Sequence, residues 1–267
     1  MVMAVPSHTM REIFRGVVPL LGPDVPVVSL SKGLEQRSLK RMTQVLREEG
    51  DLPEDRVAAL TGPNLAKEVA QRMPTASVVA CVDEGRGARL QDLFMAPSFR
   101  VYTNTDLIGC ELGGALKNVM AIAAGMAEGM GFGDNTKASL MTRGLAELAR
   151  LGVQMGGDPL TFQGLAVMGD LIATCSSKLS RNHQVGLQLA RGRSLDEIVA
   201  DMRMVAEGVK TSRAVVDLGR LVGVEVPIAE MVTHVLYEGV TPSDAVLQLM
   251  LRSAKPELHG LDRSGPR

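Results

Sequence analysis

The segment Glu111–Met130, ELGGALKNVMAIAAGMAEGM, determines how the rest of this chain is organised. It is apolar or small almost throughout, with Lys117 and Asn118 in its middle. About 20 apolar residues can span a bilayer, but a central charge makes insertion costly. The segment therefore predicts a buried helix in a soluble protein. Most lysines are solvated surface residues, whereas a lysine in such a helix needs a partner, a ligand or a lowered pKa. Lys117 is thus a candidate functional residue.

The composition is that of an ordinary soluble protein, since 45% of the 267 residues are hydrophobic and the formal net charge is -1. A near-neutral chain has no general attraction to nucleic acid or anionic lipid. The three cysteines, Cys81, Cys110 and Cys175, have no metal-binding spacing, so we expect reduced core residues and no metal site. No signal-peptide pattern opens the sequence, and we expect a cytoplasmic protein.

Apolar runs alternate with helical patterns through the first part of the chain. The runs predict strands at Val2–Val5, Pro26–Leu30, Val57–Leu60, Thr75–Val82 and Phe99–Thr103. Helical patterns cover Thr9–Leu21, Leu39–Glu48, a segment ending near Gln71, and a helix that includes Leu90–Met95. This alternation is typical of βαβ units joined by right-handed crossovers into a mostly parallel sheet.

Three short polar segments directly follow predicted strands, and ligands of such sheets bind beyond the carboxyl ends of the strands. They contain Ser7, Lys32 and Gly62–Asn64. Gly, Pro, Ser and Asn also form ordinary turns, which would explain these segments without any function. Turn chemistry does not explain Lys32.

The rest of the chain shows only helical patterns. Asp106 is placed to cap a helix through Met130, and Asp134 or Asn135 to cap the next one, which ends near Met155. Shorter helices are predicted at Pro159–Phe162, Asp170–Cys175, Asn182–Arg191, Ser194–Met202, Gly208–Val222, Pro227–Tyr237 and Pro242–Leu251. The small residues of the central helix predict close packing against its neighbours.

The fold class that follows is α/β: a partial Rossmann-like parallel sheet followed by an all-α C-terminal domain. We place an incomplete dinucleotide-binding domain in residues 1–108 and a helical substrate-binding and catalytic domain in residues 109–267.

Four polar clusters stand in otherwise apolar or small surroundings. They are Lys32, Lys117 with Asn118, Asp170 with Thr174, and Ser180–Asn182 at a predicted helix start. A helix N-terminus beside an arginine suits an anion. An ordinary Ser180 cap beside a solvated Arg181 explains that segment equally well, and Asp170 by itself fits a helix cap.

Together the clusters indicate a site for a small phosphorylated and hydroxylated substrate. A lysine would exchange a proton with an alcohol or carbonyl oxygen during hydride transfer. An unperturbed lysine titrates near 10.4, too high for a base at neutral pH. Burial of Lys117 beside a second cation, Lys32, would lower this pKa.

The motifs VPSH, SLSKGLE, LTGPNLAKEV, ELGGALKN, GDLIATC, SRNHQVG and AEGVKT, in this order, resemble the NAD(P)-dependent sn-glycerol-3-phosphate dehydrogenase family of bacterial type. The resemblance runs from Val2 to about Leu251. It implies an oxidoreductase that interconverts dihydroxyacetone phosphate and sn-glycerol 3-phosphate with NAD or NADP and supplies glycerophospholipid synthesis. The packing of the helical domain favours a homodimer.

The resemblance also implies roles for particular residues. Lys117 corresponds to the catalytic proton donor and acceptor, and it also contacts substrate. The other substrate-binding positions are Lys32, Gly62, Asn64, Asp170, Ser180, Arg181 and Asn182. The cofactor-binding positions are Lys32, Ala66, Arg181, Val205 and Glu207. Many relatives have Ser or Thr at the position of Asn64. Because Asn has no hydroxyl group, the hydroxyl contact of those relatives is not carried over to this chain.

The resemblance departs most at the start of the chain. Relatives open with G-x-G-x-x-G and two further βα units, roughly 70–80 residues by the usual lengths of such units. Here these are absent, and with them the pyrophosphate cradle and the residue that selects NAD or NADP. We therefore expect a truncated family member with exposed sheet edges and a tendency to aggregate. The alternatives are a non-catalytic remnant that binds glycerol phosphate or another subunit, and a different β-hydroxyacid dehydrogenase.

Overall fold

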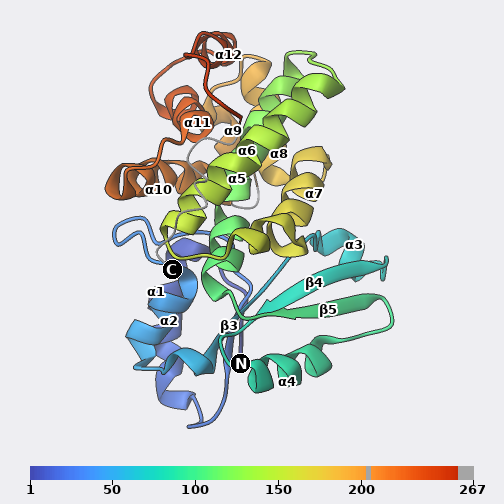
Figure 1. Cartoon of the computed structure of the whole chain (residues 1–267), viewed down its shortest axis with the longest axis vertical. Coiled ribbons are helices and arrows are strands. Elements are labelled where there is room, and N and C mark those ends of the chain that lie inside the picture. Colours follow the sequence, from blue (N-terminus) through green and yellow to red (C-terminus); the bar gives the residue numbers. More distant parts are fainter. Residues whose placement is uncertain (203–205, 258–267) are drawn as a thin grey trace.

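The computed structural model describes residues 1–202 and 206–257. A sheet lies at one end of the molecule, and helices fill the other end (Figure 1). The strands are β1 (Val2–Met3), β2 (Val27–Ser29), β3 (Val57–Thr61), β4 (Thr75–Ala80) and β5 (Phe99–Asn104), and they neighbour one another in this order. All five predicted strands are therefore present, although β1, β2 and β4 are shorter than predicted.

The sheet changes direction between β3 and β4. Strands β1, β2 and β3 are parallel to one another, and β4 is parallel to β5, but β3 and β4 pair antiparallel with Leu60 opposite Val79. A mostly parallel sheet is confirmed, whereas an unbroken series of crossovers is wrong. Residues 62–74 hold only the short helix α3 (Ala66–Ala70), which turns the chain back at the same edge. The carboxyl ends of β1, β2 and β3 thus meet the start of β4.

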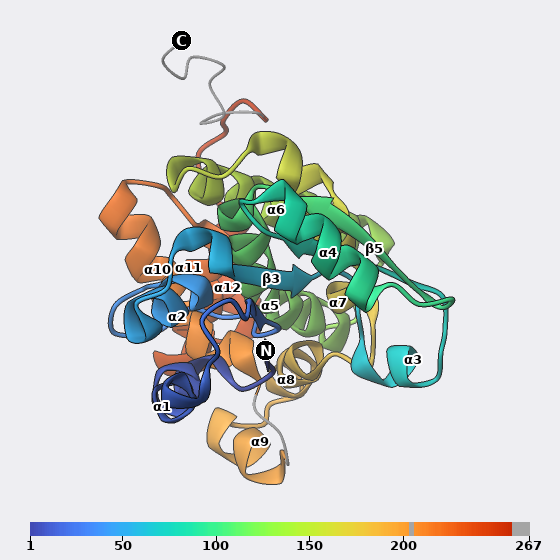
Figure 2. The same ribbon diagram turned by 90° about the horizontal axis from the view of Figure 1, so that it is seen from below.

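Helices cover both faces of this sheet. Helix α4 (Glu84–Phe94) packs on one face through Leu90, while α1 (Met10–Val17) and α2 (Met42–Gly50) bury their apolar side chains with the other face (Figure 2). Helix α2 begins three residues later than predicted, because Leu39 has a φ of 57° and lies outside the helical region.

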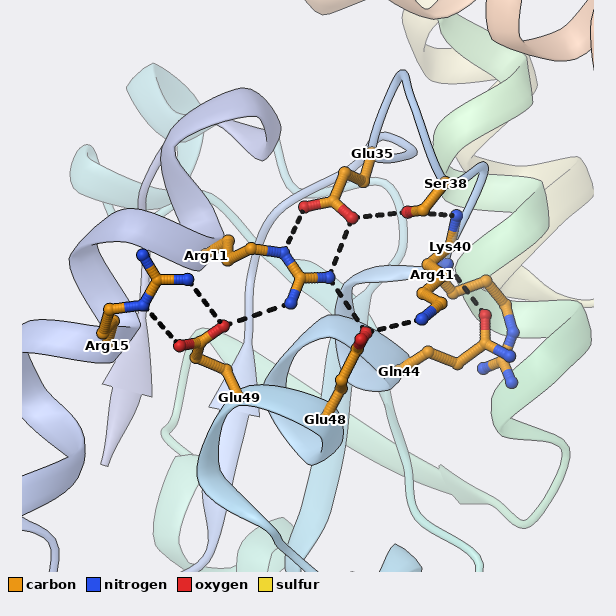
Figure 3. A network of polar contacts seen from close by, with 9 residues as sticks. All are labelled: Arg11, Arg15, Glu35, Ser38, Lys40, Arg41, Gln44, Glu48 and Glu49. Atoms are coloured by element: carbon orange, nitrogen blue, oxygen red, sulfur yellow. Dashed lines mark hydrogen bonds and ion pairs between the residues drawn. The ribbon is translucent and has the colours of Figure 1, made fainter.

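Surface charges join α1 to α2. Arg11 pairs with Glu35, Glu48 and Glu49, and Arg15 also pairs with Glu49 (Figure 3). Exposed ion pairs contribute little each. The buried apolar faces therefore hold these two helices together, and the charges orient them.

Helix α5 (Leu107–Gly129) is the central element of the helical part. It passes every test of length and composition for a membrane span, yet 89% of its most apolar window is buried inside the protein. The Asp106 carboxylate caps it by accepting from the Gly109 amide at 2.8 Å, as predicted. The neighbours of α5 are β3, α6 (Asp134–Gln154), α7 (Asp170–Ser176), α8 (Arg181–Ala190), α10 (Glu207–Val222) and α11 (Pro227–Tyr237).

The remaining described helices are α9 (Leu195–Asp201) and α12 (Pro242–Met250). Ser194 and Glu197 form the capping box that the sequence predicts for α9. The predicted cap of α6 is wrong, because Gly133 occupies the cap position and Asp134 is already helical. All three cysteines are buried and free, as expected.

Candidate active site

Lys117 is buried at the junction between the sheet and the helical part. Only 4% of the residue is exposed. Its ammonium nitrogen donates to Asp170 Oδ1 and, at 2.6 Å, to Thr174 Oγ1 on α7. Asp170 is 2% exposed, and a π-helical turn, Leu165–Gly169, precedes it. Its side chain bonds the lysine instead of capping α7, so the helix-cap interpretation of Asp170 is wrong.

Lys32 reaches the same carboxylate from the sheet. Its Nζ lies 2.8 Å from Asp170 Oδ2, 2.9 Å from the Gly62 carbonyl oxygen and 2.7 Å from Asn64 Oδ1. Residues that follow β2 and β3 thus converge at the carboxyl edge, as the sequence predicts. Gly62 has a φ of 138°, and a Cβ there would lie 3.1 Å from Ser77 Cα, so a side chain is excluded.

The two lysines share one carboxylate, and this sets the protonation of Lys117. Burial and, to a smaller extent, the positive charge of Lys32 lower the pKa of Lys117, while Asp170 raises it, and the net pKa is about 8. Lys117 therefore titrates close to neutral pH. Such a group can give up and regain a proton under physiological conditions.

A chain of amides extends from Lys32 to the start of α10. Asn118 Nδ2 donates to the Lys32 carbonyl oxygen at 3.2 Å, and Asn182 Nδ2 donates to Asn118 Oδ1 at 2.9 Å. Asn182 Oδ1 in turn accepts from the Gly208 amide at 2.9 Å. Asn182 is thereby fixed beside the lysine pair.

Glu207, the first residue of α10, is held from the sheet side. Its carboxylate accepts from Ser7 Oγ at 2.5 Å and from the Ser7 amide at 3.2 Å. Ser7 follows β1, so all three predicted strand-end segments contribute to this edge. The position of Ser7 after a strand was a sequence signal, but its pairing with Glu207, 200 positions away, was not predicted.

The start of α8 lies against the same network through Asn182. Ser180 accepts from the His183 amide at 3.3 Å, so it is a helix cap as the simpler interpretation holds. Arg181 is exposed at this N-terminus. Backbone amides, the helix dipole and a guanidinium together suit an anionic group.

One of the predicted residues within the described part of the chain is not joined to the network. Ala66 is exposed at the first turn of α3, beyond Asn64, and its methyl side chain cannot hydrogen-bond to the lysines. Val205 lies outside the described residues. Thr174, which the sequence marked only as a neighbour of Asp170, contacts Lys117 directly.

The arrangement combines three chemical capacities at one edge of the sheet. Lys117 is a buried amine that titrates near neutral pH. Lys32 and Asp170 supply a compensated pair of charges beside it. The N-terminus of α8 supplies an anion site. A small molecule with a reacting oxygen and a charged end could span these groups.

Both the sheet and the helical part of the chain match known proteins. A family model described as the NAD-dependent glycerol-3-phosphate dehydrogenase N-terminus matches residues 1–86, and the corresponding C-terminus model matches residues 106–247. A Streptomyces avermitilis protein named glycerol-3-phosphate dehydrogenase (NAD(P)+) is 56% identical over 256 residues, which cover 96% of this chain and 76% of that protein. A Thermobifida fusca protein of the same name is 52% identical, and the matched residues cover 97% of this chain and 77% of that protein.

A solved structure gives the same result. The crystal structure of a Coxiella burnetii glycerol-3-phosphate dehydrogenase superposes with a TM-score of 0.89 at 35% identity, over 94% of this chain and 76% of that one. The two family models and the closely similar relatives cover the sheet and the helical part alike. The chain therefore belongs to the NAD-dependent glycerol-3-phosphate dehydrogenase family.

Proposed function

We propose that this protein is an oxidoreductase that interconverts sn-glycerol 3-phosphate and dihydroxyacetone phosphate with NAD or NADP. The observation that carries the proposal is the position of Lys117, buried between Asp170 and Thr174 at the carboxyl edge of the sheet with a pKa of about 8. The reaction needs a group that moves one proton to or from a substrate oxygen. Lys117 is suited to that work.

Lys117 would act as the general acid and base. In the direction of alcohol oxidation, neutral Lys117 accepts the hydroxyl proton of the substrate, and in reduction the ammonium form returns it to the carbonyl oxygen. Asp170 orients the amine through its hydrogen bond and limits the lowering of its pKa. Lys32 would stabilise negative charge that develops on the same oxygen.

The residues described here fit the reacting end of the cofactor. At Gly33 an added Cβ would lie 2.6 Å from Ser7 Oγ, and at Gly114 it would lie 2.9 Å from Thr61 Oγ1, a buried oxygen without a partner. These glycines allow the segments that carry Lys32 and Lys117 to pack closely against Ser7 and Thr61. The cofactor supplies the hydride acceptor or donor. The described strand-to-helix turns carry no G-x-G-x-x-G sequence, so none offers that kind of pyrophosphate cradle.

The phosphate of the substrate would bind at the start of α8. Ser180, Arg181 and Asn182 occupy the first positions of that helix, where unsatisfied amides favour an anion. Asn182 connects this site to Lys32 through Asn118. A three-carbon substrate would thus place its phosphate on α8 and its reacting oxygen near Lys117.

The central test is the substitution Lys117→Met. We expect kcat for dihydroxyacetone phosphate to fall by roughly 10²–10⁴-fold, the usual contribution of general acid–base catalysis. The oxidation of NADH and of NADPH, followed by absorbance, measures it. Lys40→Met is the matched control, because Lys40 pairs only with surface Glu48. Near-normal turnover by Lys117→Met would exclude the assigned role.

The same assay tests the class of substrate. Dihydroxyacetone phosphate should be reduced, whereas short hydroxy acids should not be oxidised. Arg181→Gln should raise KM for the phosphorylated substrate about tenfold or more, with a smaller effect on kcat, because a charge-assisted hydrogen bond to phosphate is lost. Turnover of a hydroxy acid without turnover of the phosphorylated substrate would instead favour another β-hydroxyacid dehydrogenase.

A further inference from the structure

A cavity lies in the helical part of the chain, away from the lysine pair. Its volume is about 540 Å³, and it lies between α6, α11, α12 and the carboxyl-terminal end of α5 at the top of Figure 1. Its lining is mainly aliphatic and includes Ala127, Met130, Leu140, Ile228, Met231 and Leu249. Sites for small ligands commonly have this size and character. Lys117 is not among the lining residues, so the cavity is separate from the proposed active site.

One charged side chain in this cavity has a buried nitrogen without a hydrogen-bond acceptor in the described part of the chain. Arg150, on α6, lines the cavity and is only 8% exposed. Its Nη1 is buried and has no hydrogen-bond partner in the described part of the chain. A buried guanidinium nitrogen without an acceptor is costly, because it loses its hydration without replacement. A ligand acceptor that reaches Arg150 would remove that cost.

The neighbouring carboxyl group does not satisfy Arg150. Glu147 lies one turn earlier on α6, and its carboxylate oxygens accept from the Ile228 amide at 2.9 and 3.2 Å. Burial raises the pKa of Glu147 to about 8, so this side chain is mostly neutral at pH 7. Glu147 and Glu225 lie close enough to favour the charged form of Arg150, yet in the described part of the chain no acceptor bonds its Nη1.

The cations at the mouth of the cavity differ from Arg150, because each has a protein partner. Arg143 donates to the Glu257 carbonyl oxygen at 2.9 Å, while Arg252 and Lys255 lie 2.8 and 2.7 Å from Glu225. They form a polar rim around an apolar interior. Among these four cations, Arg150 is thus the one with a buried nitrogen that has no acceptor in the described part of the chain, and a group entering the cavity would supply one.

We propose that this cavity binds an amphiphilic carboxylate, with its charged end on Arg150 and its unbranched apolar chain against α5, α11 and α12. The charge calls for an anion, and the aliphatic walls call for a chain that leaves water. A simple inorganic anion would leave the aliphatic side chains of the cavity in contact with water. The flat face of another protein would not reach a guanidinium nitrogen that is buried. This site does not depend on the proposed catalytic function.

Titration of the full chain with dodecanoate tests the proposal. Isothermal calorimetry below the micellar concentration should show saturable binding of one molecule per chain. The affinity should rise by up to about fourfold for each methylene added from octanoate to dodecanoate. Dodecanol has the same chain without the charge, and it should bind about tenfold or more weakly.

Three variants locate the ligand. Arg150→Gln should weaken dodecanoate binding about tenfold and leave dodecanol binding unchanged. Arg252→Gln is the matched control at the exposed rim and should change the affinity by less than about twofold. Ser139→Trp adds bulk at an exposed position of the lining, and it should weaken both ligands while circular dichroism shows an unchanged fold.

Two results would overturn the proposal. One is equal affinity of dodecanoate for the unaltered chain and for Arg150→Gln. The other is no saturable binding together with a dimer in light scattering that Ser139→Trp dissociates, since the cavity would then belong to a contact with a second copy. If Arg150→Gln does not fold, equal binding of dodecanoate and dodecanol by the unaltered chain overturns it.

Discussion

The Lys117 amine lies between one carboxylate and one hydroxyl, with a second lysine on the far side of the carboxylate. Each neighbour moves its pKa in a direction that follows from charge. Burial and the Lys32 cation disfavour the ammonium form, and Asp170 favours it, with a net result of about 8 for the pKa. The reactivity of Lys117 is therefore a property of the group of three residues.

This balance predicts the pH dependence of the reaction. Alcohol oxidation needs neutral Lys117, so its rate should rise with pH up to about 8 and then level off, as the pKa of Lys117 is about 8. Ketone reduction needs the ammonium form and should decline above the same pH. Steady-state rates of oxidation and of reduction, taken from about pH 6 to about pH 10, measure this pH dependence.

Variants of the two neighbours should move this midpoint in opposite directions. Lys32→Met removes a cation, so the pKa of Lys117 should rise and the midpoint should shift to higher pH. Asp170→Asn removes the anion, and the midpoint should shift to lower pH. If both variants shifted the midpoint of the pH profile in the same direction, the assignment of the titration to Lys117 would be contradicted.

Helix α5 depends on glycine for its contact with α8. At Gly125 an added Cβ would overlap the His183 carbonyl oxygen and lie 2.8 Å from its carbonyl carbon. At Gly186 a Cβ would overlap the Ile122 carbonyl oxygen from the opposite side. Backbone atoms cannot move aside as a flexible side chain can. The small residues of α5 are thus needed for the close approach of two helices.

Gly125→Ala should therefore destabilise the protein. The overlap with backbone should lower the free energy of unfolding by about 1–3 kcal/mol or more, as overpacking does. Gly16→Ala in α1 is the matched control, since nothing lies within 4 Å of its added Cβ. It should stabilise the helix by roughly 0.5–1 kcal/mol. Urea denaturation of both variants measures the difference, and equal effects would show that α5 and α8 are not in close contact.

The molecule as a whole is joined across its two parts by buried polar pairs. Arg41, before α2, lies 2.5 Å from Glu111 of α5, and Glu111 also accepts from the Thr43 amide at 2.9 Å. Arg41 is 7% and Glu111 9% exposed. Lys32 with Asp170 and Ser7 with Glu207 make two further connections. The proposed active site includes residues of two of these connections, so its geometry depends on how firmly they hold the two parts.

Glu111→Ala should weaken this union. It leaves the buried Arg41 with its hydrogen bond to Thr43 but without a carboxylate partner, which should lower the free energy of unfolding by roughly 3–5 kcal/mol. Activity should also fall at temperatures where the variant is still folded. Lys32 belongs to the sheet part and Lys117 to the helical part, so a weaker connection between the parts disturbs their relative position. Thermal unfolding and turnover of the variant measure both effects. Arg15→Gln, which removes a surface partner of Glu49, should leave both nearly unchanged.

Much of this architecture follows from local patterns. Alternating apolar runs predicted the five strands, and a nearly continuous run of apolar and small residues, with Asp106 as its cap, predicted the buried helix α5. Two predictions at the ends of helices are wrong. Leu39 favours helix by residue type but has a left-handed backbone conformation, and Gly133 rather than Asp134 is the N-cap of α6. Neighbouring segments decide such positions, and periodicity does not report them.

The sequence by itself determined that Lys117 is buried and that Ser7, Lys32 and Gly62 follow strands, because burial and element order are encoded by nearby residues. Only the tertiary structure decided that Asp170 bonds both lysines, that Glu207 bonds Ser7, and that Arg150 lines a cavity with a buried Nη1 that has no acceptor in the described part of the chain. These contacts join or depend on residues far apart along the chain. Their geometry depends on the packing of α5 against every helix around it, which no local pattern records.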